Sequence, residues 1–549
     1  VAPAASGRNM ATADYDVIIE NGRVVDGTGA PWFYGDVAIR GDRIAAIVPR
    51  GMLRGATAKQ RVDASGLVVA PGFIDIQDQS GAQLLAGDGR QLGKLTQGVT
   101  TGILGEGSTP APLNPAALSA SASDMTKRFA EPHGFDQWLS AMQAHGISQN
   151  VGSFVGAGTI RQYGMAERMG AATGATLDSM RAAVRRAMQD GAFGMASALI
   201  YPPNTFATTA ELVEESKAMA PYGGLYITHM RSEADHILEA MDEVIRIGKE
   251  GGVATEIYHL KAAGQRNWSK EREVISKIDS ARAAGLDIQA DMYPYTAGAT
   301  GLTSCLPPQY SAEGKLYENL ASASVRAKIH QEVAHPTSDW EDLCGLATPA
   351  GVLITNLRKP ENQQYIGKRL SEIAQMKGTD YLDAAMDLIL SEHSRVETTY
   401  FLMSEDNVKL QLQQPWIKIG TDAGGPDPDS VRALVHPRTF GNYPRILGKY
   451  VRDEHVIPLE DAIRKMTSAV ADRLSIHDRG LLEPGMFADV VAFDPATIAD
   501  RATYEQPKQL SVGVRDVWVN GVQVIRGGTH TGAKPGRALR GPGYAKTTP

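Results

Sequence analysis

Three short runs between residues 223 and 291 decide the fold: GGLYITH at 223–229, VATEIYH at 253–259 and LDIQAD at 286–291. Each run is a compact strand pattern that ends on a polar side chain, at His229, His259 or Asp291. Helical patterns separate the runs, and one helix is expected over 233–249. Apolar strands that alternate with helices predict a parallel sheet covered by helices.

The polar residues that end these strands favour a barrel over an open sheet. In a (β/α)8 barrel the active site forms at the carboxyl ends of the strands, from single residues on several strands. No G-x-G-x-x-G motif follows a first strand, which counts against a dinucleotide-binding sheet. We therefore predict an α/β fold with a (β/α)8 TIM barrel. Five further strands are expected, one at 193–199 and the others ending near Gln77, Glu106, Val155 and Asp422.

Two other strand patterns compete for places in the barrel. They read GVLITN at 351–356 and TTYFLM at 398–403. Both fall in or beside a mostly helical and irregular stretch at about 298–396, which we interpret as an insertion over the barrel mouth. The number of barrel strands is therefore open by one or two.

Both ends of the chain are rich in strand patterns. Residues 14–70 alternate apolar and polar side chains, and a similar alternation occurs within 480–530. We expect these segments to form one small β-sandwich domain, with the catalytic barrel at 71–479 between them. Two terminal segments remain, a flexible N-terminal tail at 1–13 and a C-terminal tail at 531–549.

The composition excludes several classes of partner. The 549 residues are 43% hydrophobic and 21% charged, which is typical of a folded globular protein. The net charge of −7 gives no electrostatic reason to expect nucleic acid or an anionic membrane as partner. No apolar run is long enough to span a bilayer, so no membrane span is expected. Assembly into a homo-oligomer stays open.

The cysteines and the first residues bear on the compartment. Cys305 and Cys344 are the two cysteines of the chain, too few for a disulfide framework, and we expect both to be buried thiols. The small residues VAPAASG at 1–7 are typical of the remnant of a removed export signal or of a cloning scar. A periplasmic or secreted location is expected about as much as a cytoplasmic one.

The strongest sign of chemistry is the pair His229 and His259. At the ends of adjacent barrel strands they point into one pocket, where neutral imidazole is a good zinc ligand. Glu106, in GEGS, can complete a three-ligand site with an open position for water. Asp422, in GTDAGG, can accept the proton of that water and pass it to a leaving nitrogen. The plainer alternatives are packed histidines, a capping or salt-bridged Glu106 and an Asx-turn at Asp422.

Several longer strings resemble a known family. The chain resembles the amidohydrolase superfamily and, within it, the N-acyl-D-amino-acid deacylases (D-aminoacylases), over about 14–528. The resemblance implies a β-sandwich, a (β/α)8 barrel with a lid insertion, and metal-dependent amide hydrolysis. It also implies a tight zinc at His229 and His259, and a substrate carboxylate held by Lys261 and Tyr293. The strings that carry it are PGFID, QGVTT, YITHMRSEAD, YHLKAAG, DMYPYTAG, HPRTFGNYPRILGKYVRD, EDAIRKMTS and DRGLLEPGMFADVVAFDP.

The chain departs from that family at the metal site. Members normally read PGFID-x-H-x-H, whereas Gln77 and Gln79 stand at the histidine positions, and Glu106 stands where many members have Cys. An amide oxygen is a much weaker zinc ligand than imidazole, so one zinc per chain is expected. The two amides are expected instead to hold the nucleophilic water or the substrate carbonyl. Arg231 and Arg438 are weaker candidates for holding the substrate carboxylate and are expected rather to form internal ion pairs.

The expected function is zinc-dependent hydrolysis of an amide bond. N-acyl-amino acids, with the D type favoured, or short peptides are the expected substrates. The alternatives are a cyclic-amide or carbamate hydrolase, because the same chemistry serves any activated carbonyl, and a metal-free binding relative. Zinc content separates the enzymes from the binding relative.

Overall fold

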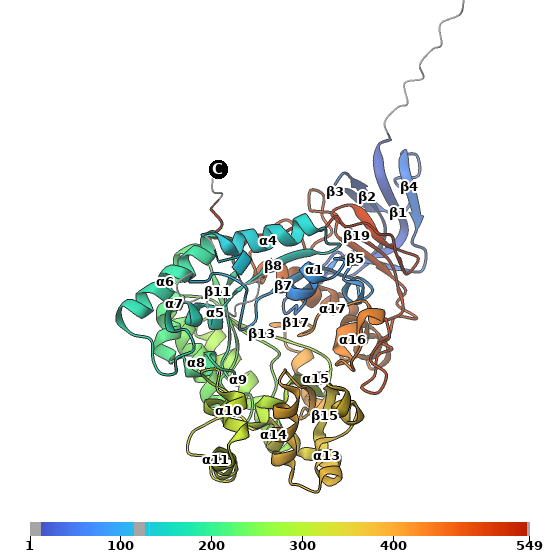
Figure 1. Cartoon of the computed structure of the whole chain (residues 1–549). Helices are drawn as coiled ribbons and strands as arrows, with labels where there is room; N and C mark the ends of the chain where they lie inside the picture. Colours follow the sequence, from blue (N-terminus) through green and yellow to red (C-terminus); the bar gives the residue numbers. More distant parts are fainter. Residues whose placement is uncertain (1–12, 115–126, 131, 546–549) are drawn as a thin grey trace, which may run out of the picture.

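A β-sheet built from both ends of the chain adjoins a barrel of parallel strands (Figure 1). The structure is a computed structural model and describes residues 13–114, 127–130 and 132–545. None of the helices in these ranges is both long and apolar enough to cross a membrane.

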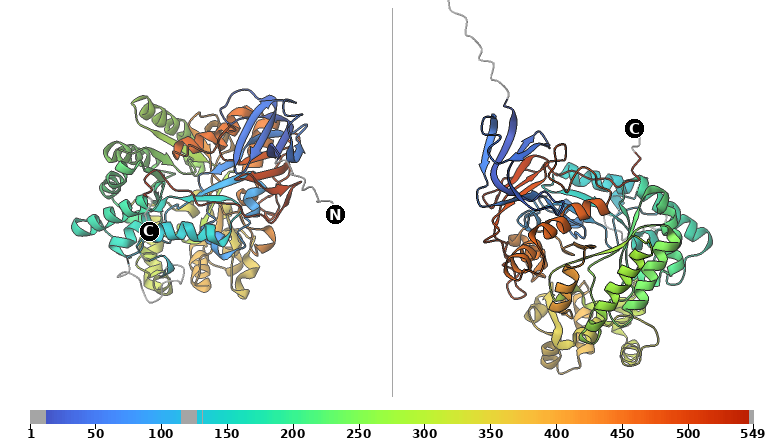
Figure 2. Two further views of the ribbon diagram at one scale, coloured as in Figure 1. Left: turned by 90° about the horizontal axis from the view of Figure 1, so that it is seen from above. Right: turned by 180° about the vertical axis from the view of Figure 1, so that it is seen from behind.

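The terminal sheet has nine strands in the order β21-β20-β19-β18-β5-β1-β2-β3, with β4 beside β1. Its two halves meet where β5 pairs antiparallel with β18, for example at Ala70 and Val491. Figure 2 shows the N-terminal strands in blue beside the C-terminal strands in red. The two chain ends therefore form one β-unit, as the sequence predicts. Its strands are β1 (Tyr15–Val24), β2 (Phe33–Arg40), β3 (Arg43–Pro49), β4 (Ala58–Asp63), β5 (Val68–Pro71), β18 (Val490–Phe493), β19 (Val514–Val519), β20 (Val522–Arg526) and β21 (Thr529–His530).

The barrel consists of two parallel sheets, β6-β7-β8 and β9-β10-β11-β12-β13-β17. On one side β9 follows β8 after a single residue, so β8 and β9 together act as one barrel strand that belongs to both sheets. On the other side the N–H of Asp422 donates to the carbonyl of Gln77 at 2.9 Å, which closes the barrel. The strands are β6 (Phe73–Asp75), β7 (Val99–Leu104), β8 (Asn150–Ser153), β9 (Val155–Gly156), β10 (Gly194–Ala198), β11 (Leu225–His229), β12 (Thr255–Ile257), β13 (Ile288–Met292) and β17 (Ile417–Ile419).

Helices flank the barrel strands because each has one apolar face. In α8 the buried residues Ile237, Met241 and Val244 recur at helical spacing and pack into the main core. A π-helix at Ile446–Asp453 directly continues α16. The α-helices described outside the insertion are α1 (Gly81–Ala86), α2 (Leu92–Leu95), α4 (Gly134–His145), α5 (Ala157–Met165), α6 (Gly174–Gln189), α7 (Thr209–Met219), α8 (Ile237–Gly251), α9 (Glu271–Ala283), α15 (Glu405–Leu412), α16 (Arg438–Arg445), α17 (Leu459–Met466) and α18 (Ser468–Arg473).

Helix α8 begins at Ile237, so the predicted start at 233 is wrong. The hydroxyl of Ser232 accepts hydrogen bonds from the N–H groups of Ala234 and His236, both at 3.2 Å. Such side-chain bonds hold a turn in place of the first helical turn. Glu233 therefore lies on the loop after β11 and not on a helix.

The insertion has a small sheet of its own, with antiparallel order β14-β16-β15. The two competing strand patterns are β15 and β16, so neither belongs to the barrel. Cys305 and Cys344 are both buried in the insertion and form a disulfide, because the chain brings their Cα atoms to 5.0 Å. The prediction of two free thiols is therefore wrong. The elements are β14 (Ala297–Gly301), α10 (Leu316–Ala321), α11 (Ala323–Ala334), α12 (Leu343–Ala347), β15 (Val352–Asn356), α13 (Leu370–Lys377), α14 (Tyr381–Glu392) and β16 (Glu397–Phe401).

The segment after β21 is packed against the barrel. The N–H of Leu539 donates to the carbonyl of Val151 at 2.7 Å, and the N–H of Gly541 donates to the carbonyl of Gly191 at 2.8 Å. Arg540 also pairs with Asp136 of α4 at 2.6 Å. The C-terminal segment thus braces the edge of the barrel where β8 begins.

A buried lysine ties the first barrel strand to the last. The Nζ of Lys94, on α2, donates to the carboxylate of Asp75 at 2.5 Å, to the hydroxyl of Thr421 at 2.5 Å and to the carbonyl of Ala423 at 2.7 Å. The side chains of Lys94 and Asp75 are both fully buried. Because Asp75 ends β6 and Thr421 follows β17, this cluster supports the closure of the barrel.

Lys94→Met is expected to lower the free energy of unfolding by about 3–5 kcal/mol, because it leaves a buried carboxylate without its counter-charge. Urea unfolding followed by fluorescence measures the change. The control is Lys59→Met, which removes the exposed pair of Lys59 with Asp16 and should shift the midpoint little. Equal midpoint shifts in the two variants would show that the Lys94 cluster does not support the barrel.

Candidate metal centre and active site

The chemistry-bearing residues meet at the carboxyl ends of the barrel strands. His229 is the last residue of β11, and His259 follows two residues after β12. Glu106 lies two residues after β7, and Asp422 lies three residues after β17. All four line one cavity of about 780 Å³. The structure thus brings together residues that the sequence places at four separate strand ends.

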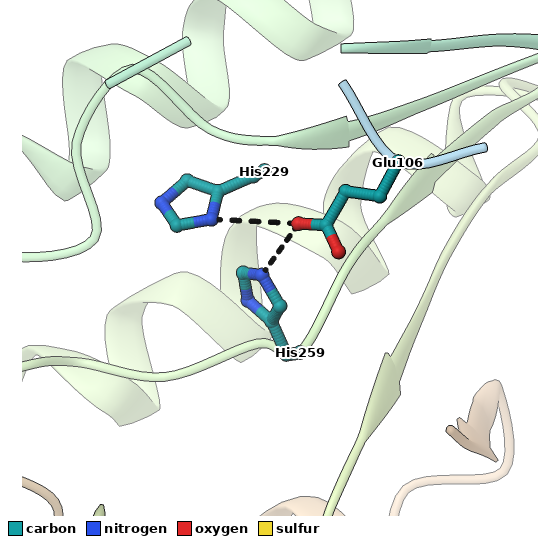
Figure 3. Close-up of side chains that lie close together, drawn as sticks. All are labelled: Glu106, His229 and His259. Carbon is teal, nitrogen blue, oxygen red and sulfur yellow. Dashed lines mark hydrogen bonds and ion pairs between the residues drawn. The ribbon is translucent and has the colours of Figure 1, made fainter. Parts of the chain in front are cut away.

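One oxygen of the Glu106 carboxylate faces a ring nitrogen of each of the two histidines (Figure 3). Its Oε1 atom is 3.2 Å from Nε2 of His259 and 3.7 Å from Nδ1 of His229. The three ligand atoms lie within 4.8 Å of one another. Two imidazoles and one carboxylate with space beside them fit a catalytic zinc ion, which uses three protein ligands and keeps one open position.

The charge states around Glu106 suit a cation. Burial raises the pKa of the Glu106 carboxyl, but hydrogen bonds and charge from His229 and His259 outweigh it and hold that pKa well below its usual value. Burial and Lys261 lower the pKa of His259, yet the carboxylates of Glu233 and Glu106 raise it to about 10. A metal ion that binds here must therefore displace a proton from His259.

Two of the functional residues have an uncommon backbone conformation. His259 has a φ of 36° and Asp422 a φ of 48°, in the left-handed region that residues with a Cβ seldom adopt. The buried carboxylate of Asp291 accepts a hydrogen bond from the N–H of His259 at 2.9 Å, which holds the turn. Backbone strain of this kind is typical of functional sites, where the surrounding structure maintains it.

Gln77 and Gln79 both point at Glu106. Their Nε2 atoms donate to Oε2 of Glu106 at 2.7 Å and 2.6 Å, and Gln79 also approaches Oδ1 of Asp422 at 3.3 Å. The amide hydrogens thus occupy the side of Glu106 that faces away from His229 and His259. Oε1 of Glu106 stays directed at the histidines.

Asp422 is held by a buried arginine. Nη2 of Arg438 lies 2.8 Å from Oδ2 of Asp422, and the guanidinium lies over the ring of Tyr293, with 4.4 Å between its carbon and the ring centroid. Burial raises the pKa of Asp422, and the charge of Arg438 opposes this rise. Within the described part of the chain, Nε and Nη1 of Arg438 are buried and have no hydrogen-bond partner. Arg438 therefore forms the internal ion pair that the sequence predicts, lines the cavity and retains two unpaired N–H groups.

The two lysine and arginine candidates from the sequence are tied to carboxylates. Nζ of Lys261 lies 2.8 Å and 2.7 Å from the two oxygens of Glu233. Arg231 forms a two-pronged pair with Glu243, at 2.9 Å and 2.8 Å, as predicted for an internal ion pair. Tyr293 is buried and lines the cavity, with its ring centroid 5.9 Å from the Nζ of Lys261.

Sequence reasoning missed Glu233 and Glu341. Glu233 contacts His229, His259 and Lys261, and Glu341 of the insertion accepts a hydrogen bond from Ser232 at 2.8 Å. The spacing of four residues from His229 to Glu233 was a usable signal, but the helical pattern of the segment hid it. Nothing in the local sequence marks Glu341, because only the tertiary fold brings the insertion to the barrel.

Comparison with known proteins identifies the family of the chain. Residues 361–525 match the Amidohydrolase family. The chain is 36% identical over 533 residues to a D-aminoacylase of Alcaligenes xylosoxydans xylosoxydans, covering 96% of this chain and 97% of the relative.

Two solved structures are similar throughout. An N-acyl-D-glutamate deacylase of Bordetella bronchiseptica, complexed with zinc and a phosphonate mimic of the tetrahedral intermediate, is 32% identical with a TM-score of 0.79 and covers 96% of this chain and 99% of its own. A D-aminoacylase, 33% identical with a TM-score of 0.79, covers 96% of this chain and 100% of its own. That D-aminoacylase has a binuclear metal centre, described by one-metal activation and second-metal attenuation. With these identities over nearly its whole length, the chain belongs to the N-acyl-D-amino-acid deacylase family of the amidohydrolases.

Proposed function

We propose that this protein hydrolyses N-acyl-D-amino acids with one zinc ion held by Glu106, His229 and His259. The observation that carries the proposal is the convergence of these three ligand atoms within 4.8 Å at the mouth of the barrel. The donor set of two imidazoles and a carboxylate suits zinc, and the adjoining cavity leaves room for water and substrate. A bound zinc ion would supply a Lewis acid for the amide carbonyl and lower the pKa of a water molecule.

Asp422 is the proton carrier in this proposal. Its carboxylate lines the same cavity as Glu106 and the two histidines. The ion pair with Arg438, 2.8 Å between Nη2 and Oδ2, fixes the orientation of this carboxylate. From this position it takes a proton from the attacking water and delivers it to the amide nitrogen that leaves. Burial raises the pKa of Asp422, and the charge of Arg438 only partly offsets this rise, so the carboxylate has a higher proton affinity than an exposed aspartate.

Arg438 and Tyr293 are the proposed anchors for the carboxylate of the substrate. Arg438 lines the cavity, and within the described residues its Nε and Nη1 atoms have no hydrogen-bond partner, so its positive charge and an N–H donor remain for one oxygen of a substrate carboxylate. Lys261 also lines the cavity, but the carboxylate of Glu233 neutralises its charge. We therefore propose that Lys261 contributes less than Arg438 to binding the substrate carboxylate. Tyr293 supplies a hydroxyl donor and the ring on which Arg438 stacks.

The two amides support a site for one metal. Gln77 and Gln79 give the outer oxygen of Glu106 two N–H donors, at 2.7 Å and 2.6 Å, where a second cation would otherwise compensate its charge. We infer that this chain corresponds to the one-metal form of its relatives and escapes attenuation by a second ion.

The first experiment is a substrate screen with metal-stripped protein and with protein given one equivalent of zinc. N-acetyl-D-amino acids should release free amino acid only with zinc, and faster than N-acetyl-L-amino acids, dipeptides or hydantoins. Amine release measures turnover, and His259→Ala should lose both zinc and activity. Turnover that persists after zinc removal, or that is confined to hydantoins, would refute the proposal.

Asp422→Asn should keep zinc while turnover falls by about two to four powers of ten, because the amide cannot carry the proton. Metal analysis and kcat are measured on the same preparation. Asp429→Asn, at an exposed carboxylate nearby in the chain, is the control and should change neither quantity. Loss of zinc from Asp422→Asn would make Asp422 a metal ligand instead of a proton carrier.

Restoring imidazoles with Gln77→His and Gln79→His together should let a second zinc bind, more weakly than the first. Titration calorimetry counts the ions, and turnover at rising zinc should now decline, whereas the unchanged protein should show no such decline. Gln83→His is the control, because Gln83 lines the cavity without an amide contact to Glu106 and should add no second ion. Two ions bound with similar strength by the unchanged protein would contradict the one-metal site.

A further inference from the structure

Glu233 contacts both histidines of the candidate metal centre from the side opposite Glu106. Its Oε1 atom is 2.8 Å from Nδ1 of His259, and its Oε2 atom is 3.6 Å from Nε2 of His229. Glu106 faces the other ring nitrogen of each histidine. The side chain of Glu233 is only 6% exposed, so water does not compete for these contacts.

The zinc-binding form of the two histidines needs an acceptor at this position. Nε2 of His259 must be free of a proton to bind a metal, so the proton of the neutral ring sits on Nδ1. Lys261 also lies 2.6 Å from Nδ1, but an ammonium group has no acceptor and cannot take this proton. Glu233 can, and its second oxygen lies 3.6 Å from Nε2 of His229, which has no hydrogen-bond partner within the described residues.

We propose that Glu233 is a positioning residue that fixes the tautomer and the orientation of both His229 and His259 for zinc. The inference rests on the zinc site of the proposed function. Carboxylate partners behind metal-ligating histidines hold the ring and raise its basicity. In this chain one carboxylate serves both rings, so a single substitution disturbs two ligands at once.

The loop that carries Glu233 is held from three directions. Lys261 pairs with its carboxylate, the N–H of Ala263 donates to its carbonyl at 2.7 Å, and its own N–H donates to the carboxylate of Glu341. Glu341 belongs to the insertion and also accepts from the hydroxyl of Ser232 at 2.8 Å. The insertion therefore supports the loop on which the two histidine contacts depend.

Glutamine cannot replace Glu233 in this arrangement. The carboxylate accepts two hydrogen bonds from Lys261, and its two oxygens lie 2.8 Å from Nδ1 of His259 and 3.6 Å from Nε2 of His229. An amide has one acceptor oxygen, and its NH₂ group would face a donor at the other position. Loss of such a partner typically weakens metal binding by about 10–100-fold.

The test compares zinc affinity in Glu233→Gln and the unchanged protein, measured by competition with a chelator. We expect the zinc dissociation constant to rise by about 10–100-fold, and the zinc-induced rise in melting temperature to shrink, each measured against the metal-free form of the same variant. Glu392→Gln is the control, because Glu392 is also a buried carboxylate that accepts several hydrogen bonds, from Arg358, Lys359 and Asn362, but lies in the insertion away from the histidines. Equal zinc affinity in Glu233→Gln and Glu392→Gln would overturn the proposal.

A second pair of variants separates positioning from simple charge balance. If Glu233 only neutralises Lys261, the double variant Glu233→Gln, Lys261→Met should regain the zinc affinity of the unchanged protein, which would refute the positioning role. We expect the double variant to bind zinc as weakly as Glu233→Gln. If Glu233→Gln does not fold, Glu233→Asp keeps the charge but withdraws it by one methylene group, and unchanged zinc affinity there would equally refute the role.

Failure of this inference is distinct from failure of the proposed function. Zinc affinity is measured without turnover, so a protein that binds zinc through this site but hydrolyses no N-acyl-D-amino acid would contradict only the proposed reaction. A protein that does not bind zinc at all would contradict both.

Discussion

The closure of the barrel is the constraint on which the site depends. The hydrogen bond from the N–H of Asp422 to the carbonyl of Gln77 joins the last strand to the first, and Lys94 holds Asp75 and Thr421 together beneath it. Parallel strands place all their carboxyl ends on one face, so closure gathers their terminal side chains around one cavity. Without it, Gln79 would not approach Asp422 and Glu106 together.

Charge pairing then decides what each buried group can do. Unpaired charges are costly in a site with little water, and here carboxylates alternate with cationic groups: Glu106 lies against the histidines, Glu233 against Lys261, and Asp422 against Arg438. Asp422 and Arg438 each keep atoms directed at the cavity. Lys261 gives its three short contacts to Glu233 and His259. For this reason we propose that Arg438 contributes more than Lys261 to binding the substrate carboxylate.

In the proposed one-metal site, Gln77 and Gln79 take the place of a second cation. The similar D-aminoacylase has a binuclear metal centre. In this chain Gln77 and Gln79 direct N–H groups at Oε2 of Glu106, which gives the carboxylate neutral donors. A pair of neutral donors leaves the site with less positive charge than a metal ion, and this favours uptake of a proton by Asp422 in the proposed reaction.

The sequence by itself determined the fold class and the strand ends that carry His229, His259, Glu106 and Asp422. Strand and helix patterns depend on neighbours in the chain, and the family strings extend over most of its length, so both can be recognised without coordinates. The sequence did not reveal the disulfide between Cys305 and Cys344, the start of α8 at Ile237, or the roles of Glu233, Glu341 and Arg438. Whether Lys261 is free or paired, and which oxygen of Glu106 faces the histidines, were also decided only by the tertiary structure. The physical reason is that a buried polar group takes its partners from segments far apart in the chain, and those partners are set only when the barrel closes and the insertion packs against its mouth.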